Sequence, residues 1–127
     1  ELQMDSDFHF IPMNDVLFDL QRKIILDAAE KEDCVIVGRC ANHILDNKCL
    51  SVFIHAPFEY RVQTVIERTG REEKSAQKLV KKVDKERRTY YEYFTDKKWK
   101  DISQYHLAFD SSKFEQDKII QMIKMAL

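Results

Sequence analysis

The chain has 127 residues, of which 44% are hydrophobic, 34% charged and 11% aromatic, and its formal net charge is −1. This length and apolar content suit one domain, spanning residues 1–127, with a substantial hydrophobic core. The two glycines, Gly38 and Gly70, lie too far apart to form either common glycine-rich phosphate loop, and so few glycines exclude collagen-like chains. No apolar run reaches the roughly 18 residues of a membrane span, so no membrane association is expected.

The first predicted elements are a helix, a strand and a short helix. Asn14 or Asp15 can cap the first helix. An apolar stripe at 3-4-4 spacing is expected to face the core: Leu17, Leu20, Ile24 and Ala28. The run Cys34–Val37 then predicts a short, fully buried strand, and Ala41–Leu45 a short helix.

Strands and helices alternate through the rest of the chain. In order, the pattern predicts a strand over 50–54, a helix from Pro57 to Gly70, a long helix over about 73–94, a strand over 105–109 and a helix over 114–125. This alternation is typical of an α/β fold, in which a parallel sheet is flanked by helices. An all-α fold is the alternative, because the strands are few and short.

Ligands bind open parallel sheets beyond the carboxyl ends of the strands, and three places qualify. Gly38 and Arg39 follow the Cys34–Val37 strand; the glycine allows close backbone approach and the arginine offers a planar fork to a phosphate. A surface arginine at a strand end is the plainer interpretation. The segment His55–Pro57 could present N–H groups to an anion, or form an ordinary turn. Asp110–Ser112 could contact a base or ribose, or cap the final helix.

Arginines on two helices form the second candidate cluster. Arg61 and Arg68, seven residues apart, share one face of their helix. The stripe of the long helix reads Ala76, Val80, Val83, Arg87, Tyr90 and Phe94. Arg87 therefore stands where an apolar residue is expected, which marks a candidate functional position. An ion pair of Asp84 with Arg87 or Arg88 is the structural alternative.

Residues 68–100 are basic, with twelve Lys/Arg against six Asp/Glu, which points to an anionic ligand. Several arginines around one anion suit phosphoryl transfer, in which negative charge spreads over the transferred group. Basic and aromatic residues together could also bind single-stranded nucleic acid, although the interleaved acids leave no continuous basic stripe. The four histidines and three cysteines have no metal-ligand spacing, so no structural metal is expected, and the cysteine usage favours a reduced, cytoplasmic protein.

With these motifs laid out, the sequence resembles the cytidylate kinase-like family of P-loop nucleoside monophosphate kinases. The resemblance covers about residues 16–125. Its motifs are Cys34-Val-Ile-Val-Gly-Arg-Cys-Ala41, Val52-Phe-Ile-His-Ala-Pro-Phe-Glu-Tyr-Arg61, Asp84-Lys-Glu-Arg87-Arg-Thr-Tyr90-Tyr, Phe94-Thr95 through Lys98-Trp99, and the strand end Asp110-Ser111-Ser112.

The resemblance implies transfer of the γ-phosphoryl group of ATP to CMP or a similar acceptor, with Mg²⁺. Gly38 and Arg39 would bind the acceptor's phosphate, and Asp84 would orient Arg87 or reach the acceptor sugar. Further substrate contacts would come from Asp110 and Ser111. A helical lid over about residues 68–100 would close over the phosphates, and the catalytic arginines would be Arg61, Arg68, Arg87 and Arg88.

The family begins with a strand and a glycine-rich loop that hold ATP and Mg²⁺, and no such segment occurs in this sequence. We therefore expect the fold to be incomplete at its N-terminus and the chain as given to be inactive. Small-molecule nucleotides are the expected partners, nucleic acid is not favoured, and a homo-oligomer stays open. A non-catalytic nucleotide-binding module is the alternative function, followed by a single-stranded nucleic-acid binder.

Overall fold

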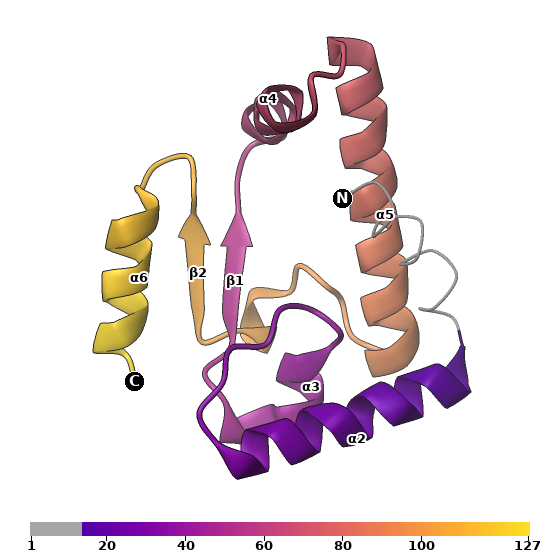
Figure 1. Cartoon of the computed structure of the whole chain (residues 1–127), viewed down its shortest axis with the longest axis vertical. Helices are drawn as coiled ribbons and strands as arrows, with labels where there is room; N and C mark the ends of the chain where they lie inside the picture. The colour runs from indigo at the N-terminus through magenta and orange to yellow at the C-terminus, as the bar shows by residue number, and fades with distance from the viewer. Residues whose placement is uncertain (1–13) are drawn as a thin grey trace. The chain divides into compact units, whose positions relative to one another are not determined.

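The computed structural model describes residues 14–127 and divides into two compact units (Figure 1). Among these residues are five helices and two strands. Their bounds are α2 Asp15–Lys31, α3 Ala41–Leu45, β1 Val52–His55, α4 Phe58–Thr69, α5 Glu73–Thr95, β2 Leu107–Asp110 and α6 Gln116–Met125. Unit 1 comprises the described residues up to 49 together with 85–104, and unit 2 comprises 50–84 and 105–127. The single domain over 1–127 and the lid over 68–100 stay predictions, and residues 1–13 lie outside the described part.

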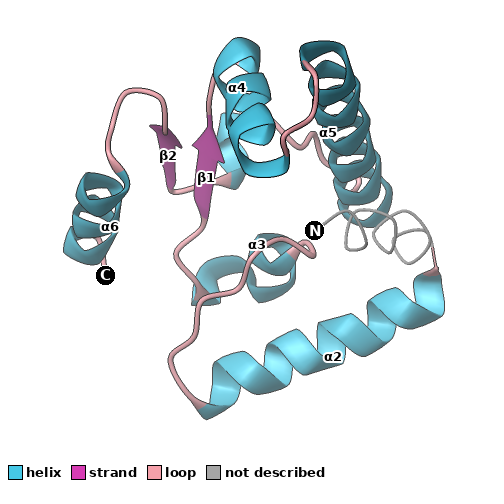
Figure 2. Ribbon diagram, turned by 45° about the horizontal axis from the view of Figure 1, so that its top comes forward, coloured by secondary structure: helices cyan, strands magenta, loops and turns pink. Residues whose placement is uncertain are grey.

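Unit 2 contains the sheet. Strands β1 and β2 pair in parallel, with Val52 opposite Leu107 and His55 opposite Asp110. The pairing extends one step before the strands, because the His106 N–H donates to the Ser51 carbonyl at 2.8 Å. The Ser51 N–H donates in turn to the side chain of His106, at 2.9 Å from Nδ1. Helix α6 lies beside β2 in both views (Figures 1 and 2). The α/β class with a parallel sheet is confirmed, and the all-α alternative is wrong.

Helices α4 and α5 form the second part of unit 2. Gly70 ends α4 as predicted, with φ at 72° and its N–H donating to the Ile66 carbonyl at 2.8 Å. After two intervening residues α5 begins at Glu73, close to its predicted start. A small core joins the two helices, formed by Val62, Ala76 and Val80 with Phe58, Val65 and Ile66 packed against it.

Unit 1 is built on α2, whose start the sequence predicts correctly. The Asn14 side chain accepts a hydrogen bond from the Leu17 N–H at 3.1 Å. The predicted core stripe is wrong, however, because its members Leu17, Leu20 and Ile24 are 36%, 50% and 67% exposed. The buried face instead centres on Ile25. Helix α3 explains the difference, because its residues Ala41 and Leu45 cover Ile25. Helix α2 itself is apolar on more than one face.

The predicted buried strand Cys34–Val37 is also wrong. Its backbone belongs to no strand, and within residues 14–127 only β1 and β2 pair. Ile36 packs against the core around Ile25, whereas Val35 and Val37 are 93% and 89% exposed. A buried strand needs hydrogen-bonded neighbours and covered faces, and no described residue supplies them. No helix of the described residues is long and apolar enough to cross a membrane.

The end of α4 gives a test of the backbone conformation. Gly70→Ala should lower the free energy of unfolding by about 1 kcal/mol, because a Cβ is strained at positive φ. The space around Gly70 is open, so the effect comes from the backbone and not from a clash. Gly70→Asn is the matched control, because asparagine tolerates the left-handed region, and its loss should be smaller. Urea unfolding followed by circular dichroism measures both; equal losses would contradict the explanation.

Candidate functional site

The most unusual backbone of unit 1 is the turn of Gly38, Arg39 and Cys40. All three residues lie in the left-handed region, with φ at 73°, 57° and 58°. The Ala41 N–H donates to the Gly38 carbonyl at 3.1 Å across the turn. For the two residues with side chains this conformation costs about 1–2 kcal/mol each. Strain of this kind persists where the surroundings enforce it, and it gathers at functional sites.

Cys40 anchors this turn. Its side chain is 3% exposed and forms a buried cluster with Tyr90 and Tyr91, against which Phe18 and Trp99 pack. Burial raises the pKa of the Cys40 thiol to about 12, against which Arg39 acts weakly. A thiol with such a pKa is protonated at physiological pH and is a poor nucleophile. Cys40 therefore packs the turn and does no chemistry.

The side chain of Arg39 is half-buried, and its charge acts on the Tyr90 hydroxyl. Burial is the main reason that the pKa of Tyr90 lies above its usual value, and the charge of Arg39 and its hydrogen bond act in the opposite direction. The Tyr90 hydroxyl also donates to Oε1 of Gln21 on α2 at 3.0 Å. Unit 1 thus holds the predicted phosphate ligand on a defined side-chain network.

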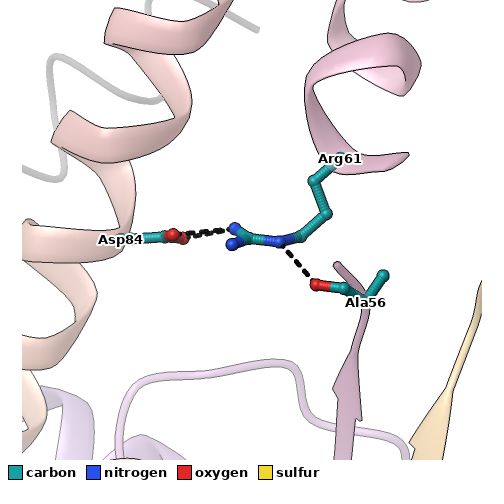
Figure 3. Close-up of polar contacts among 3 residues, drawn as sticks. All are labelled: Ala56, Arg61 and Asp84. Atoms are coloured by element: carbon teal, nitrogen blue, oxygen red, sulfur yellow. Dashed lines mark hydrogen bonds and ion pairs between the residues drawn. The ribbon is translucent and has the colours of Figure 1, made fainter. Parts of the chain in front are cut away.

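Arg61 and Asp84 form the main polar contact of unit 2 (Figure 3). Nη1 of Arg61 donates to both carboxylate oxygens of Asp84, at 2.8 and 2.7 Å, and Nε donates to the Ala56 carbonyl at 3.0 Å. The two side chains are 32% and 21% exposed. The expected pairing of Asp84 with Arg87 or Arg88 is wrong. Arg61 takes that place because the Ala56 carbonyl directs its guanidinium towards α5.

The other predicted arginines are exposed. Arg68 lies in the last turn of α4. Arg87 and Arg88 are exposed on α5 and form no ion pair with any described residue. The stripe of α5 is buried at Val80 and again at Tyr90, within two different clusters. Arg87 lies between these clusters, and this explains why a charged residue interrupts the apolar pattern there.

Asp110 and Ser111 lie at the carboxyl end of the sheet, as predicted. Oδ1 of Asp110 accepts from the Ser112 N–H at 2.9 Å and from its hydroxyl at 2.6 Å, and the Ser111 N–H donates to the His55 carbonyl at 2.9 Å. The hydrogen bonds from Ser112, with smaller effects of His55, lower the pKa of Asp110 below its usual value. These side chains do not cap the last helix, since α6 has Glu115 at its N-cap.

The predicted site residues therefore fall in both units. Unit 2 contains Arg61, Arg68, Asp84, Asp110 and Ser111, and it brings Arg61 and Asp84 together. Unit 1 contains Gly38, Arg39, Arg87 and Arg88. Sequence reasoning missed Tyr90 as a partner of Arg39, since a tyrosine on an apolar stripe reads as core. It also missed Gln21, for which the sequence carries no signal.

The strain at Arg39 can be measured. Arg39→Gly and Arg39→Ala both remove the side chain, but only glycine adopts the left-handed region without strain. The glycine variant should therefore be more stable than the alanine variant by roughly 1 kcal/mol. Urea unfolding of the two variants tests this difference. An alanine variant as stable as the glycine variant would show that the turn is not left-handed at residue 39.

The Arg61–Asp84 contact also predicts a stability difference. Asp84→Ala should lower the free energy of unfolding by about 1–2 kcal/mol, because it leaves a half-buried guanidinium without its charged acceptor. Asp27→Ala is the matched control: Asp27 pairs with Lys31 at 2.9 Å, but the side chains are 60% and 72% exposed. Such exposed pairs on one helix contribute about 0.3–0.5 kcal/mol. Urea unfolding measures both variants. Equal losses of unfolding free energy would show that the contact of Asp84 with Arg61 stabilises the chain no more than an exposed ion pair does.

This chain is similar to known proteins over most of its length. The model of the cytidylate kinase-like family matches residues 3–113. Cytidylate kinases of Methanococcoides burtonii and Pyrococcus furiosus are each 30% identical, over 91% and 80% of this chain. That of Methanopyrus kandleri is 26% identical over 80% of it.

The chain spans 65%, 53% and 58% of the length of these three relatives, in that order. Among solved structures, an uncharacterized protein from Eubacterium ventriosum is 35% identical with a TM-score of 0.75, and the match covers 95% of this chain and 72% of that one. The family match extends over most of the chain and includes the strained turn, the Arg61–Asp84 pair and the three exposed arginines. The chain belongs to the cytidylate kinase-like family.

Proposed function

We propose that this chain is the acceptor-binding and lid part of a P-loop nucleoside monophosphate kinase, which transfers the γ-phosphoryl group of ATP to CMP or a similar acceptor. Family membership supports the reaction class, and small-molecule nucleotides in the cytoplasm are part of the proposal. One observation of the structure carries it furthest. A strained left-handed turn presents Arg39 at the end of an extended segment, and such strain is characteristic of ligand-binding positions.

The arginines divide into held and exposed groups. Arg39 is held by the strained backbone of its turn and would bind the acceptor's phosphate through its planar fork. Arg61 is held by Asp84 and Ala56, so its position is defined before any ligand binds. Asp84 thereby orients Arg61, and contact with the acceptor sugar is its second proposed role.

The exposed arginines are Arg68, Arg87 and Arg88. Arg87 and Arg88 have no ion pair among the described residues, so they can turn towards a phosphate without breaking one. Positive charge that reaches the transferred group stabilises the negative charge on its oxygens, which is the main task in phosphoryl transfer. A lid over about residues 68–100 is the proposed carrier of these three side chains.

The family implies ATP and Mg²⁺, which require metal ligands and a glycine-rich phosphate loop. No group of three or more His, Cys, Asp or Glu residues in the described part could hold a metal ion. The two glycines at positive φ, Gly38 and Gly70, belong to separate turns. The described residues do not fit Mg²⁺ or a triphosphate, and we derive no step through either.

Binding of single-stranded nucleic acid is not supported by Tyr90 and Tyr91 of α5. Tyr90 and Tyr91 are 4% and 5% exposed and pack around Cys40. Bases stack on exposed aromatic faces, so these two rings cannot serve as a platform. The other alternative is a module that binds nucleotides without phosphoryl transfer. It is distinguished from a kinase by measuring binding and turnover separately.

The test is binding and turnover in arginine variants. In the protein as its own cells produce it, Arg39→Ala and Arg87→Ala should each lower kcat/KM for CMP by about 100-fold or more, since each removes a charge from the phosphates. A coupled ADP assay measures turnover, and isothermal titration measures CMP binding. Lys48→Ala, an exposed cation in no proposed role, is the control and should change neither value.

Unchanged turnover in both arginine variants would overturn the proposal. CMP binding without turnover in the unaltered protein would favour the non-catalytic module.

A further inference from the structure

We infer that Lys81 of α5 is a further phosphate-binding residue, which lies with Arg61 of α4 over the ring of Phe58. The inference rests on the proposed function, in which Arg61 contacts the phosphates of a nucleotide. It adds a cation that the sequence motifs did not single out. Its basis is a set of contacts between one turn of α4 and one turn of α5, both in unit 2.

Two residues of each helix make these contacts. On α4, Phe58 and Arg61 are three residues apart and share one face of the helix. On α5, the same spacing places Lys81 and Asp84 on one face. Nη1 of Arg61 donates to both carboxylate oxygens of Asp84, at 2.8 and 2.7 Å (Figure 3). Nζ of Lys81 lies over the Phe58 ring, 5.7 Å from its centroid.

The Phe58 ring is thus in contact with two cations. Cζ of Arg61 also lies over it, 6.0 Å from the centroid. The face of an aromatic ring attracts positive charge over distances up to about 6 Å. The ring itself is held, because Phe58 is half-buried and packs against the core that joins α4 and α5. Two positive charges, which repel each other, are therefore kept at one place on these helices.

The charges of this cluster do not balance. In the described part of the chain, Asp84 is the one carboxylate that forms an ion pair with either cation, and its partner is Arg61. Lys81 is exposed and forms no ion pair with any described residue. An aromatic ring attracts an ammonium group without neutralising it. One positive charge is therefore left over, and it is held at the same ring as Arg61.

Arg61 keeps donors for a ligand while it is paired. A guanidinium has five N–H groups. Nε donates to the Ala56 carbonyl at 3.0 Å, and Nη1 donates to Asp84. Nη2 donates to no described residue and is not among the buried polar atoms. The two N–H groups of Nη2 and the three of the Lys81 ammonium can therefore donate to a ligand.

A phosphate group suits these two donors. Its oxygens accept several hydrogen bonds at once, from the planar fork of an arginine and from the compact charge of a lysine. In phosphoryl transfer, negative charge spreads over several oxygens, so a second cation stabilises charge that one arginine does not reach. Lys81 should therefore strengthen both the binding of a phosphate and its transfer.

The first test compares two adjacent lysines. Lys81→Met removes the charge and keeps an apolar chain that packs on Phe58. Lys82→Met is the matched control, because it removes the same charge from an exposed residue that leaves the helix about 100° away. In the protein as its own cells produce it, Lys81→Met should lower kcat/KM for CMP about tenfold in the coupled ADP assay. Lys82→Met should lower it less than about twofold.

Two more variants test the arrangement around the ring. Lys81→Arg should keep kcat/KM within about threefold, because it restores a cation that stacks on an aromatic face. Phe58→Leu keeps an apolar residue in the core and removes the ring. In the Phe58→Leu background, Lys81→Met should cost less than about threefold, because the ring no longer holds the lysine. An equal cost in both backgrounds would overturn the arrangement of Lys81 on Phe58.

A ligand that needs no transfer separates the inference from the proposed function. Isothermal titration with inorganic pyrophosphate measures phosphate binding alone, and Lys81→Met should weaken it about tenfold. Equal effects of Lys81→Met and Lys82→Met on binding and turnover would overturn the inference and leave the kinase activity standing. An unaltered protein that does not bind pyrophosphate would overturn the inference as well. Pyrophosphate binding that depends on Lys81, in a protein without turnover, would support the inference and overturn the proposed reaction.

Discussion

The strained turn of Gly38, Arg39 and Cys40 has a conformational cost that packing elsewhere in unit 1 must offset. Two non-glycine residues in the left-handed region cost about 1–2 kcal/mol each, and the local sequence offers nothing to offset this. The compensation is tertiary, because Cys40 is buried among aromatic rings of α5. The turn therefore exists only when the second half of α5 is folded. Packing of this kind fixes the backbone at Arg39 whether or not a ligand is bound.

Helix α5 supports both units through a single apolar stripe. Its first half packs on α4 through Ala76 and Val80, and its second half packs on the strained turn through Tyr90 and Tyr91. Between these contacts the helix is covered by neither cluster, and Arg87 and Arg88 lie there. The same helix carries Asp84, which fixes Arg61 of α4. One element thus holds two arginines in defined positions and leaves two others exposed.

Local chemistry explains what could be predicted from the sequence. The start of α2 at Asn14 and the end of α4 at Gly70 depend on hydrogen bonds within a few residues, so the predicted boundaries agree with the structure. The buried face of α2 depends instead on α3, and an apolar stripe cannot show which of two faces is covered. The strand over Cys34–Val37 fails for a related reason, since pairing is a property of two segments.

The candidate site shows the same division. Arg39 could be singled out by its place after a predicted strand, and Arg87 because it interrupts an apolar stripe. Arg61 and Asp84 could be singled out separately, but their contact joins residues 23 positions apart and depends on how α4 packs against α5. The polar contact of Tyr90 could not be predicted, because its ring fits the apolar stripe of α5. Its hydroxyl donates a hydrogen bond to Gln21, far away in the sequence.

The segment Cys34–Val37 has a consequence for how copies of the chain can interact. Val35 and Val37 are almost fully exposed among the described residues. Apolar β-branched residues on an unpaired extended backbone are a template for intermolecular strand pairing and aggregation. Charged residues flank this segment, with Lys31, Glu32 and Asp33 on one side and Arg39 on the other. Hydrated charges beside an exposed apolar run oppose the stacking of copies, which is the effect ascribed to gatekeeper residues.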